Sequence, residues 1–92
     1  MKVKVKFYAD FKKLFDVERE VELGDQARIQ DLLNKLCDTD ERRQEILDNS
    51  GKVKPSVMVM LRRGQRSDVV DKEHTELKDG DLVMVLRTVF GG

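Results

Sequence analysis

Several scarcities narrow what this 92-residue sequence can be. It contains one cysteine, and its 18 basic and 18 acidic residues give a formal net charge of zero. A lone cysteine excludes an internal disulfide and favours a reducing, intracellular setting. A balanced charge argues against direct binding to nucleic acid, which requires a concentrated basic face. The sequence has neither the ~20 apolar residues of a membrane span nor the apolar run of a signal peptide, so we expect a cytoplasmic protein.

Catalytic and metal-binding patterns are also scarce. We find no nucleophile–base pair, no phosphate-binding loop and no cluster of metal ligands in the sequence, and His74 has no Cys or His nearby. The acids in Asp79-Gly80-Asp81 indicate a turn rather than catalytic chemistry. Cys37 follows a predicted helix, and we interpret it as a core residue, with a thioester or redox role as the alternative. The chain is therefore predicted not to be an enzyme on its own.

Alternation of apolar and polar residues is the clearest pattern that is present. Residues 2–7 place valine and phenylalanine on one face and Lys2, Lys4 and Lys6 on the other, which predicts a half-buried strand. We interpret the lysine stripe as solvated or as protecting a sheet edge. Residues 17–23 alternate again, with Val17 expected to face inward. In chain order the predicted strands are residues 2–7, 17–23, 56–62, 69–70 and 82–87.

The periodicity becomes helical between residues 26 and 37. Apolar residues recur there at i, i+3, i+4 and i+7, and Asp25 is the expected N-cap. A short helical turn is expected at residues 11–15, and a second short helix beginning near residues 38–40. We therefore expect one α+β domain with this core: Val3, Val5, Phe7, Val21, Leu23, Ile29, Leu32, Leu33, Leu36, Val57, Val59, Leu61, Leu77, Val83 and Val85.

The order of these elements, the segment Leu77-Lys78-Asp79-Gly80-Asp81 and the ending Gly91-Gly92 resemble the β-grasp sulfur-carrier family. That family includes the molybdopterin-synthase small subunit, the thiamine-pathway sulfur carrier, the ubiquitin-related modifier and the archaeal small modifiers. The resemblance implies a ubiquitin-like β-grasp fold over residues 1–87, a mixed four- to five-stranded sheet wrapped on one main helix, with residues 88–92 as a flexible tail. One departure is Arg87-Thr88, where many molybdopterin-synthase small subunits carry Pro-Pro.

The resemblance also implies chemistry at the C-terminal carboxylate of Gly92, next to Gly91. A carboxylate is ionised at neutral pH and is a poor electrophile, so it needs activation. The implied partner is a ubiquitin-activating-type enzyme that uses ATP to adenylate Gly92, while the chain itself binds no cofactor. A persulfide donor protein would then convert the adenylate to a thiocarboxylate. Glycines suit this role because they lack a Cβ and can thread a narrow channel.

A docking surface is expected on the outer face of the sheet. The valines and the leucine of residues 56–62, and the valines of residues 82–87, are expected to face the core. Met58, Met60, Met84 and Leu86 then face outward. Exposed apolar patches often mark interaction sites, and methionine suits surfaces that meet several partners. We expect these four residues to dock the activating enzyme, with Phe90 anchoring the tail. The alternatives are that residues 41–48 or a second copy of the chain covers this face.

Three functions remain open from the sequence. The first is a sulfur carrier for a molybdopterin or tungsten cofactor, a thiazole precursor or tRNA thiolation, with the large subunit of molybdopterin synthase as a further partner. The second is a protein modifier that joins Gly92 to lysines of target proteins. The third is a non-conjugating ubiquitin-like binding module. Deleting Gly91 and Gly92 separates the third from the others, because a binding module would keep its partner.

Overall fold

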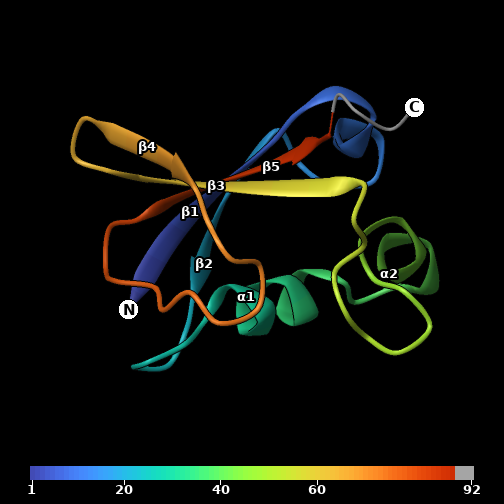
Figure 1. Ribbon diagram of the computed structural model, residues 1–92, viewed down its shortest axis with the longest axis horizontal. Helices are drawn as coiled ribbons and strands as arrows, with labels where there is room; N and C mark the ends of the chain where they lie inside the picture. The colour runs from blue at the N-terminus through green and yellow to red at the C-terminus, as the bar shows by residue number, and fades with distance from the viewer. Residues whose placement is uncertain (89–92) are drawn as a thin grey trace.

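Five strands form one mixed sheet in the computed structural model, which describes residues 1–88 (Figure 1). In space the strands are ordered β2-β1-β5-β3-β4. The central pair β1 and β5 is parallel, and the other three pairs are antiparallel. The strands are β1 (Lys2–Phe7), β2 (Glu18–Glu22), β3 (Val57–Arg63), β4 (Arg66–Val69) and β5 (Leu82–Arg87).

The helices α1 (Ile29–Leu36) and α2 (Asp40–Ile46) lie on the same side of the sheet, and the 3-10 helix η1 (Ala9–Lys13) follows β1 (Figure 1). The apolar face of α1 is fully buried against the sheet, as its spacing predicts. Thr39 caps α2, because its hydroxyl oxygen accepts a hydrogen bond from the Arg42 N–H. Phe7 stacks on Phe15 after η1, with ring centroids 4.4 Å apart. The α+β architecture is therefore confirmed.

The core lies between the sheet and these helices. All fifteen predicted core residues are buried, and Phe11, Phe15 and Ile46 join them. Val17 is an exception to the predicted pattern, since it is 55% exposed. The prediction for Val17 was wrong because β2 is an edge strand that begins only at Glu18, and the core covers only its later part, around Val21.

The predicted start of the main helix was also wrong. The helix begins at Ile29 rather than near residue 26, and Asp31 rather than Asp25 caps it by accepting a hydrogen bond from the Arg28 N–H at 2.9 Å. The backbone before Ile29 is occupied elsewhere, because Arg28 forms a β-bridge with Glu76 and the Ala27 carbonyl accepts from Leu77. Gln26 lies in a turn with a φ of +66°, and Ala27 and Arg28 then bridge to the segment before β5.

The strand β4 differs from its predicted position. It spans Arg66–Val69 rather than residues 69–70, because the turn at Gly64 is tight and the pairing of Arg63 with Arg66 closes the hairpin directly. Gly64 has a φ of +60°, a conformation that glycine adopts without a steric penalty. Within the described residues no helix is long and apolar enough to cross a membrane.

A turn at residues 79–81 holds the start of β5 against β1. Gly80, at a φ of +86°, donates its N–H to the Lys2 carbonyl, and Lys4 donates to the Asp81 carbonyl. The Asp81 carboxylate is buried and accepts hydrogen bonds from the Lys78 N–H at 2.7 Å and from Arg63 Nε at 2.9 Å. This carboxylate therefore joins the turn to β3 across β5.

Replacing Asp81 with alanine is expected to lower the free energy of unfolding by about 2 kcal/mol, measured by urea denaturation. The Lys78 N–H, whose bond to Asp81 is partly buried, loses its acceptor, whereas the half-exposed Arg63 regains water in part. Asp68→Ala is the matched control, because its ion pair with Arg66 is exposed to solvent and contributes little. Equal stability of the Asp81 variant and the wild type would show that the turn does not depend on this carboxylate.

Candidate functional site

The outer face of the sheet carries the predicted apolar residues side by side. Met58 lies opposite Leu86, and Met60 lies opposite Met84, in the antiparallel register of β3 and β5. All four are half-buried, while their inward neighbours such as Val59 and Val85 are fully buried. Helix α2 does not cover this face, because its Ile46 belongs to the core on the other side. We call Met58, Met60, Met84 and Leu86 the methionine face.

Charged residues flank the methionine face in an ordered way. One row runs across all five strands, since the register places Glu18, Lys6, Met84, Met60 and Val69 in succession. The lysine stripe of β1 thus lies between the acidic residues of β2 and the apolar centre. Of the two interpretations of this stripe, solvation agrees with the exposure of Lys2 and Lys4, whereas edge protection was wrong because β1 is an interior strand of the sheet.

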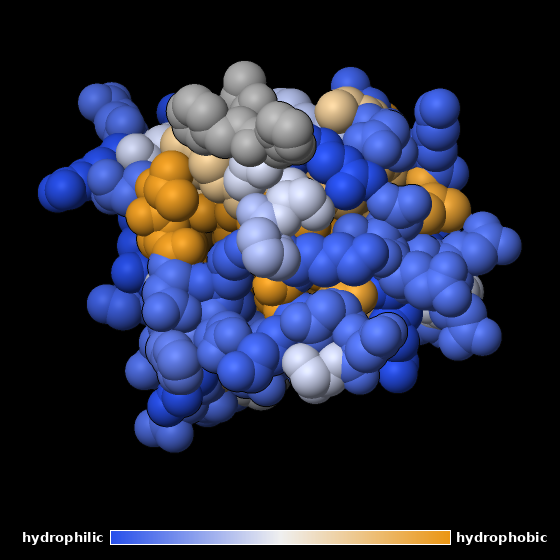
Figure 2. All heavy atoms as spheres, turned by 45° about the vertical axis from the view of Figure 1, so that its right-hand side comes forward, coloured by the Kyte–Doolittle hydropathy of each residue, from blue (hydrophilic) through white to orange (hydrophobic). Residues whose placement is uncertain are grey.

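The side of the molecule that Figure 2 shows is mostly hydrophilic. Hydrophobic residues gather there in a few separate patches among charged and polar ones. This distribution agrees with the 39% of charged residues in the sequence. The methionine face lies on β3 and β5, two adjacent strands in the interior of this sheet.

The end of β5 is held by an ion-pair cluster that the sequence analysis missed. Arg87 donates from Nε and from a terminal nitrogen to the two oxygens of Asp10, both at 3.0 Å, and it also bonds Glu45. Its guanidinium lies 4.2 Å from the centre of the Phe11 ring. The sequence did contain one signal for this cluster. Side chains alternate along a strand, so Arg87 is expected to lie on the same side as Val83 and Val85, which is the core side.

Thr88 directly follows this cluster and is the last of the described residues. Thr88 donates its N–H to the Ser56 carbonyl at 3.0 Å. The predicted anchor Phe90 and the predicted activated residues Gly91 and Gly92 lie outside the described residues. Their roles therefore stay predictions, whereas the strand that leads to them is placed in the middle of the sheet.

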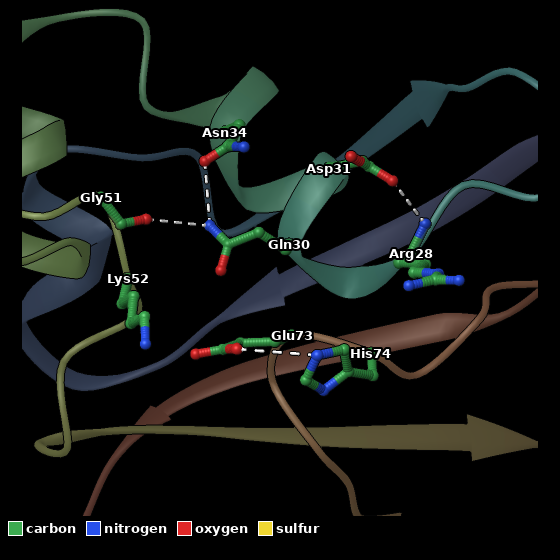
Figure 3. A pocket seen from close by; sticks show the side chains of 8 residues that line it. All are labelled: Arg28, Gln30, Asp31, Asn34, Gly51, Lys52, Glu73 and His74. Carbon is green, nitrogen blue, oxygen red and sulfur yellow. Dashed lines mark hydrogen bonds and ion pairs between the residues drawn. The ribbon is translucent and has the colours of Figure 1, made fainter.

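A shallow polar pocket lies near the start of α1, and Figure 3 shows the residues that line it. Gln30 Nε2 donates to the Asn34 side chain at 3.0 Å and to the Gly51 carbonyl at 3.2 Å. His74 is exposed and lies beside the carboxylates of Asp71 and Glu73. Within residues 1–88 no three His, Cys, Asp or Glu side chains are grouped so that they could hold a metal ion.

Cys37 is a core residue, as the sequence analysis favours. It ends α1, is 2% exposed and packs in the main hydrophobic cluster. Burial raises the pKa of the Cys37 thiol to about 11. The thiolate, which is the nucleophile, is therefore scarce at neutral pH.

The fold defines a class of protein, the ubiquitin-like β-grasp domains, with the C-terminal strand at the centre of the sheet. The family model of the ThiS family matches residues 5–92. The chain belongs to the ThiS family, and with it to the ubiquitin-like sulfur carriers and modifiers.

Solved structures agree with this family. The chain is 33% identical to a putative molybdopterin converting factor, subunit 1, from Pyrococcus furiosus, with a TM-score of 0.71 and coverage of 96% of this chain and 98% of that one. SAMP1 from Haloferax volcanii has a TM-score of 0.81 at 17% identity, with 100% of both chains covered. A chain in the complex of subunits 1 and 2 of the molybdopterin-converting factor from Helicobacter pylori has a TM-score of 0.60 at 24% identity, again with 100% of both chains covered. The curated proteins yield no sequence match.

Native Cys37 is expected to resist a thiol reagent such as dithionitrobenzoate at pH 7.5. Its burial and its pKa of about 11 leave little accessible thiolate, so labelling should proceed only at the rate of unfolding. The same protein in urea is the control and should label completely. Rapid labelling of the folded protein would contradict the core assignment and revive a thioester or redox role.

Proposed function

We propose that this protein is a cytoplasmic sulfur carrier that is activated at the carboxylate of Gly92. The observation that carries the proposal is the methionine face, which shares β5 with the chain that leads to Gly91 and Gly92. An apolar face of this kind can bind an activating enzyme while the end of the same strand continues toward that enzyme's active site. Membership of the ThiS family supports the carrier role.

The chemistry requires a partner, because the Gly92 carboxylate is a poor electrophile until ATP activates it. In the proposed reaction a Gly92 carboxylate oxygen attacks the α-phosphorus of ATP and releases pyrophosphate. The terminal sulfur of a protein persulfide then attacks the acyl carbon and displaces AMP. A second thiol cleaves the resulting acyl disulfide, which leaves a thiocarboxylate on the carrier and a disulfide on the donor side. The carrier itself holds no cofactor in this scheme.

The sulfur acceptor in the proposal is a pterin precursor bound by a synthase large subunit. The support is that the Pyrococcus furiosus relative is described as a molybdopterin converting factor subunit. The Helicobacter pylori neighbour is described in complex with a second subunit, which fits a carrier that docks a larger partner. Thiolation of tRNA and attachment of Gly92 to protein lysines are the alternatives that the experiment below separates.

The intact mass of the protein from its native cell tests the proposal. We expect a free species that is heavier than the sequence by the difference between sulfur and oxygen, and that reacts as a thiocarboxylate. Deleting the large subunit of the synthase should increase the amount of this species, whereas an unchanged amount would favour tRNA thiolation. Lysine adducts that retain a Gly-Gly remnant, without a thiocarboxylate species, would favour the modifier. Finding neither would favour the binding module.

The double variant Met60→Asp and Leu86→Asp is expected to abolish adenylation while the protein still folds. Two carboxylates on the methionine face would have to lose water in an apolar interface, which is costly. The measurement is ATP–pyrophosphate exchange by the activating enzyme, with thermal unfolding followed by circular dichroism.

Val17→Asp is the matched control for this double variant. Val17 is 55% exposed and lies away from the methionine face. Val17→Asp therefore also replaces an apolar side chain at the surface with an acid. The control should be adenylated normally. Unchanged adenylation of the double variant would contradict docking through this face.

A further inference from the structure

The point where β5 leaves the sheet has an unusual set of neighbours. Val85 is still paired on both sides, with Phe7 of β1 and Val59 of β3. At Arg87 the strand pairs only with Val57 of β3, because β1 has ended and η1 has begun. Side-chain bonds replace the missing strand on this side.

These bonds come from two elements at once. Arg87 reaches Asp10 on η1 with two hydrogen bonds and Glu45 on α2 with a third. A guanidinium that binds a carboxylate with two parallel bonds is fixed in direction as well as in distance. The Phe11 ring beneath it is 1% exposed and is therefore a rigid support. We call Arg87, Asp10 and Glu45 the exit clamp.

The exit clamp and the methionine face lie on opposite sides of β5. Arg87 has the parity of the buried Val85, whereas Met84 and Leu86 point outward. A change in the clamp therefore leaves the proposed docking residues in place. The hydrogen bonds from the Arg87 guanidinium also hold the pKa of the Asp10 carboxyl below its usual value.

We propose that Arg87 is a positioning residue for C-terminal activation. It fixes the backbone at Arg87-Thr88, and with it the point and direction from which the chain continues to Gly92. This inference rests on the proposed function. A reacting carboxylate must be presented in a narrow range of orientations, and a misplacement of about 1 Å can lower the rate roughly 100-fold. In this proposal the methionine face binds the activating enzyme, and the exit clamp orients the backbone from which the C-terminus continues.

The kinetic test is ATP–pyrophosphate exchange as a function of carrier concentration. Arg87→Met keeps an apolar side chain over Phe11 but removes the fork of donors. We expect kcat to fall roughly 10- to 100-fold with KM for the carrier within about twofold. Arg87→Lys keeps the charge but not the fork, so kcat should recover only in part.

Arg66→Met is the matched control. Arg66 also forms an ion pair with a carboxylate, Asp68, but on the exposed edge strand β4, so its loss should change neither constant. An unchanged kcat for Arg87→Met would overturn the proposal. So would an increase of KM alone, because that result would make Arg87 a contact for the partner instead.

A second readout does not depend on activation at all. In hydrogen exchange followed by NMR, the Thr88 amide, bonded to Ser56, should lose protection by about tenfold or more in Arg87→Met. The Lys4 amide, bonded to Asp81 at the other end of β5, should keep its protection. Equal protection of Thr88 in both proteins would overturn the clamp even if the wild type is never adenylated. If the Thr88 amide loses protection in Arg87→Met but no enzyme adenylates the wild-type protein, the clamp stands and the proposed function is overturned.

If Arg87→Met does not fold, the double variant Asp10→Asn and Glu45→Gln provides the same two readouts. It leaves Arg87 over Phe11 and neutralises only the acceptors. Slower turnover together with faster Thr88 exchange supports positioning. Wild-type values in both measurements overturn it.

Discussion

The parallel pairing of β1 with β5 is the constraint on which the rest of the structure depends. It joins residues 2–7 to residues 82–87, so its formation closes nearly the whole chain into one loop. Parallel pairs need a long crossover, and here the crossover contains both α-helices and the β3–β4 hairpin. Asp81 and Gly80 secure this pairing at the start of β5. The last strand consequently lies at the centre of the sheet, not at an edge.

Under the proposed function, a central β5 serves stability and recognition at the same time. Its alternation divides these tasks between its faces, since Val83 and Val85 complete the core and Met84 and Leu86 complete the methionine face. Substitutions on the outer face can therefore change recognition without creating a core cavity. An enzyme of this size would instead need a cleft in addition to its core, whereas a carrier needs only a face and an end.

The sequence was most informative where local periodicity sets the structure. The alternation at residues 82–87 predicted the bounds of β5, and the helical spacing from Ile29 predicted the buried face of α1. It failed where distant contacts decide the outcome. Ala27 and Arg28 have helix-compatible side chains but bridge to the segment around Glu76, and no local pattern reports that bridge. The exit clamp joins Arg87 to Asp10 across 77 positions, so the partners of Arg87 follow only from the fold.

The exit clamp also gives physical meaning to the departure at Arg87-Thr88. The molybdopterin-synthase small subunits that the sequence resembles often carry Pro-Pro there, and proline restricts a backbone by fixing φ. Proline has no N–H, so it could not make the bond from Thr88 to the Ser56 carbonyl. In this chain that bond and the ion pairs of Arg87 restrict the same stretch of backbone from outside. A covalent restraint holds in every conformation, whereas the clamp holds only when η1, α2 and β5 are assembled. Presentation of the C-terminus is thereby coupled to the folded state of the carrier.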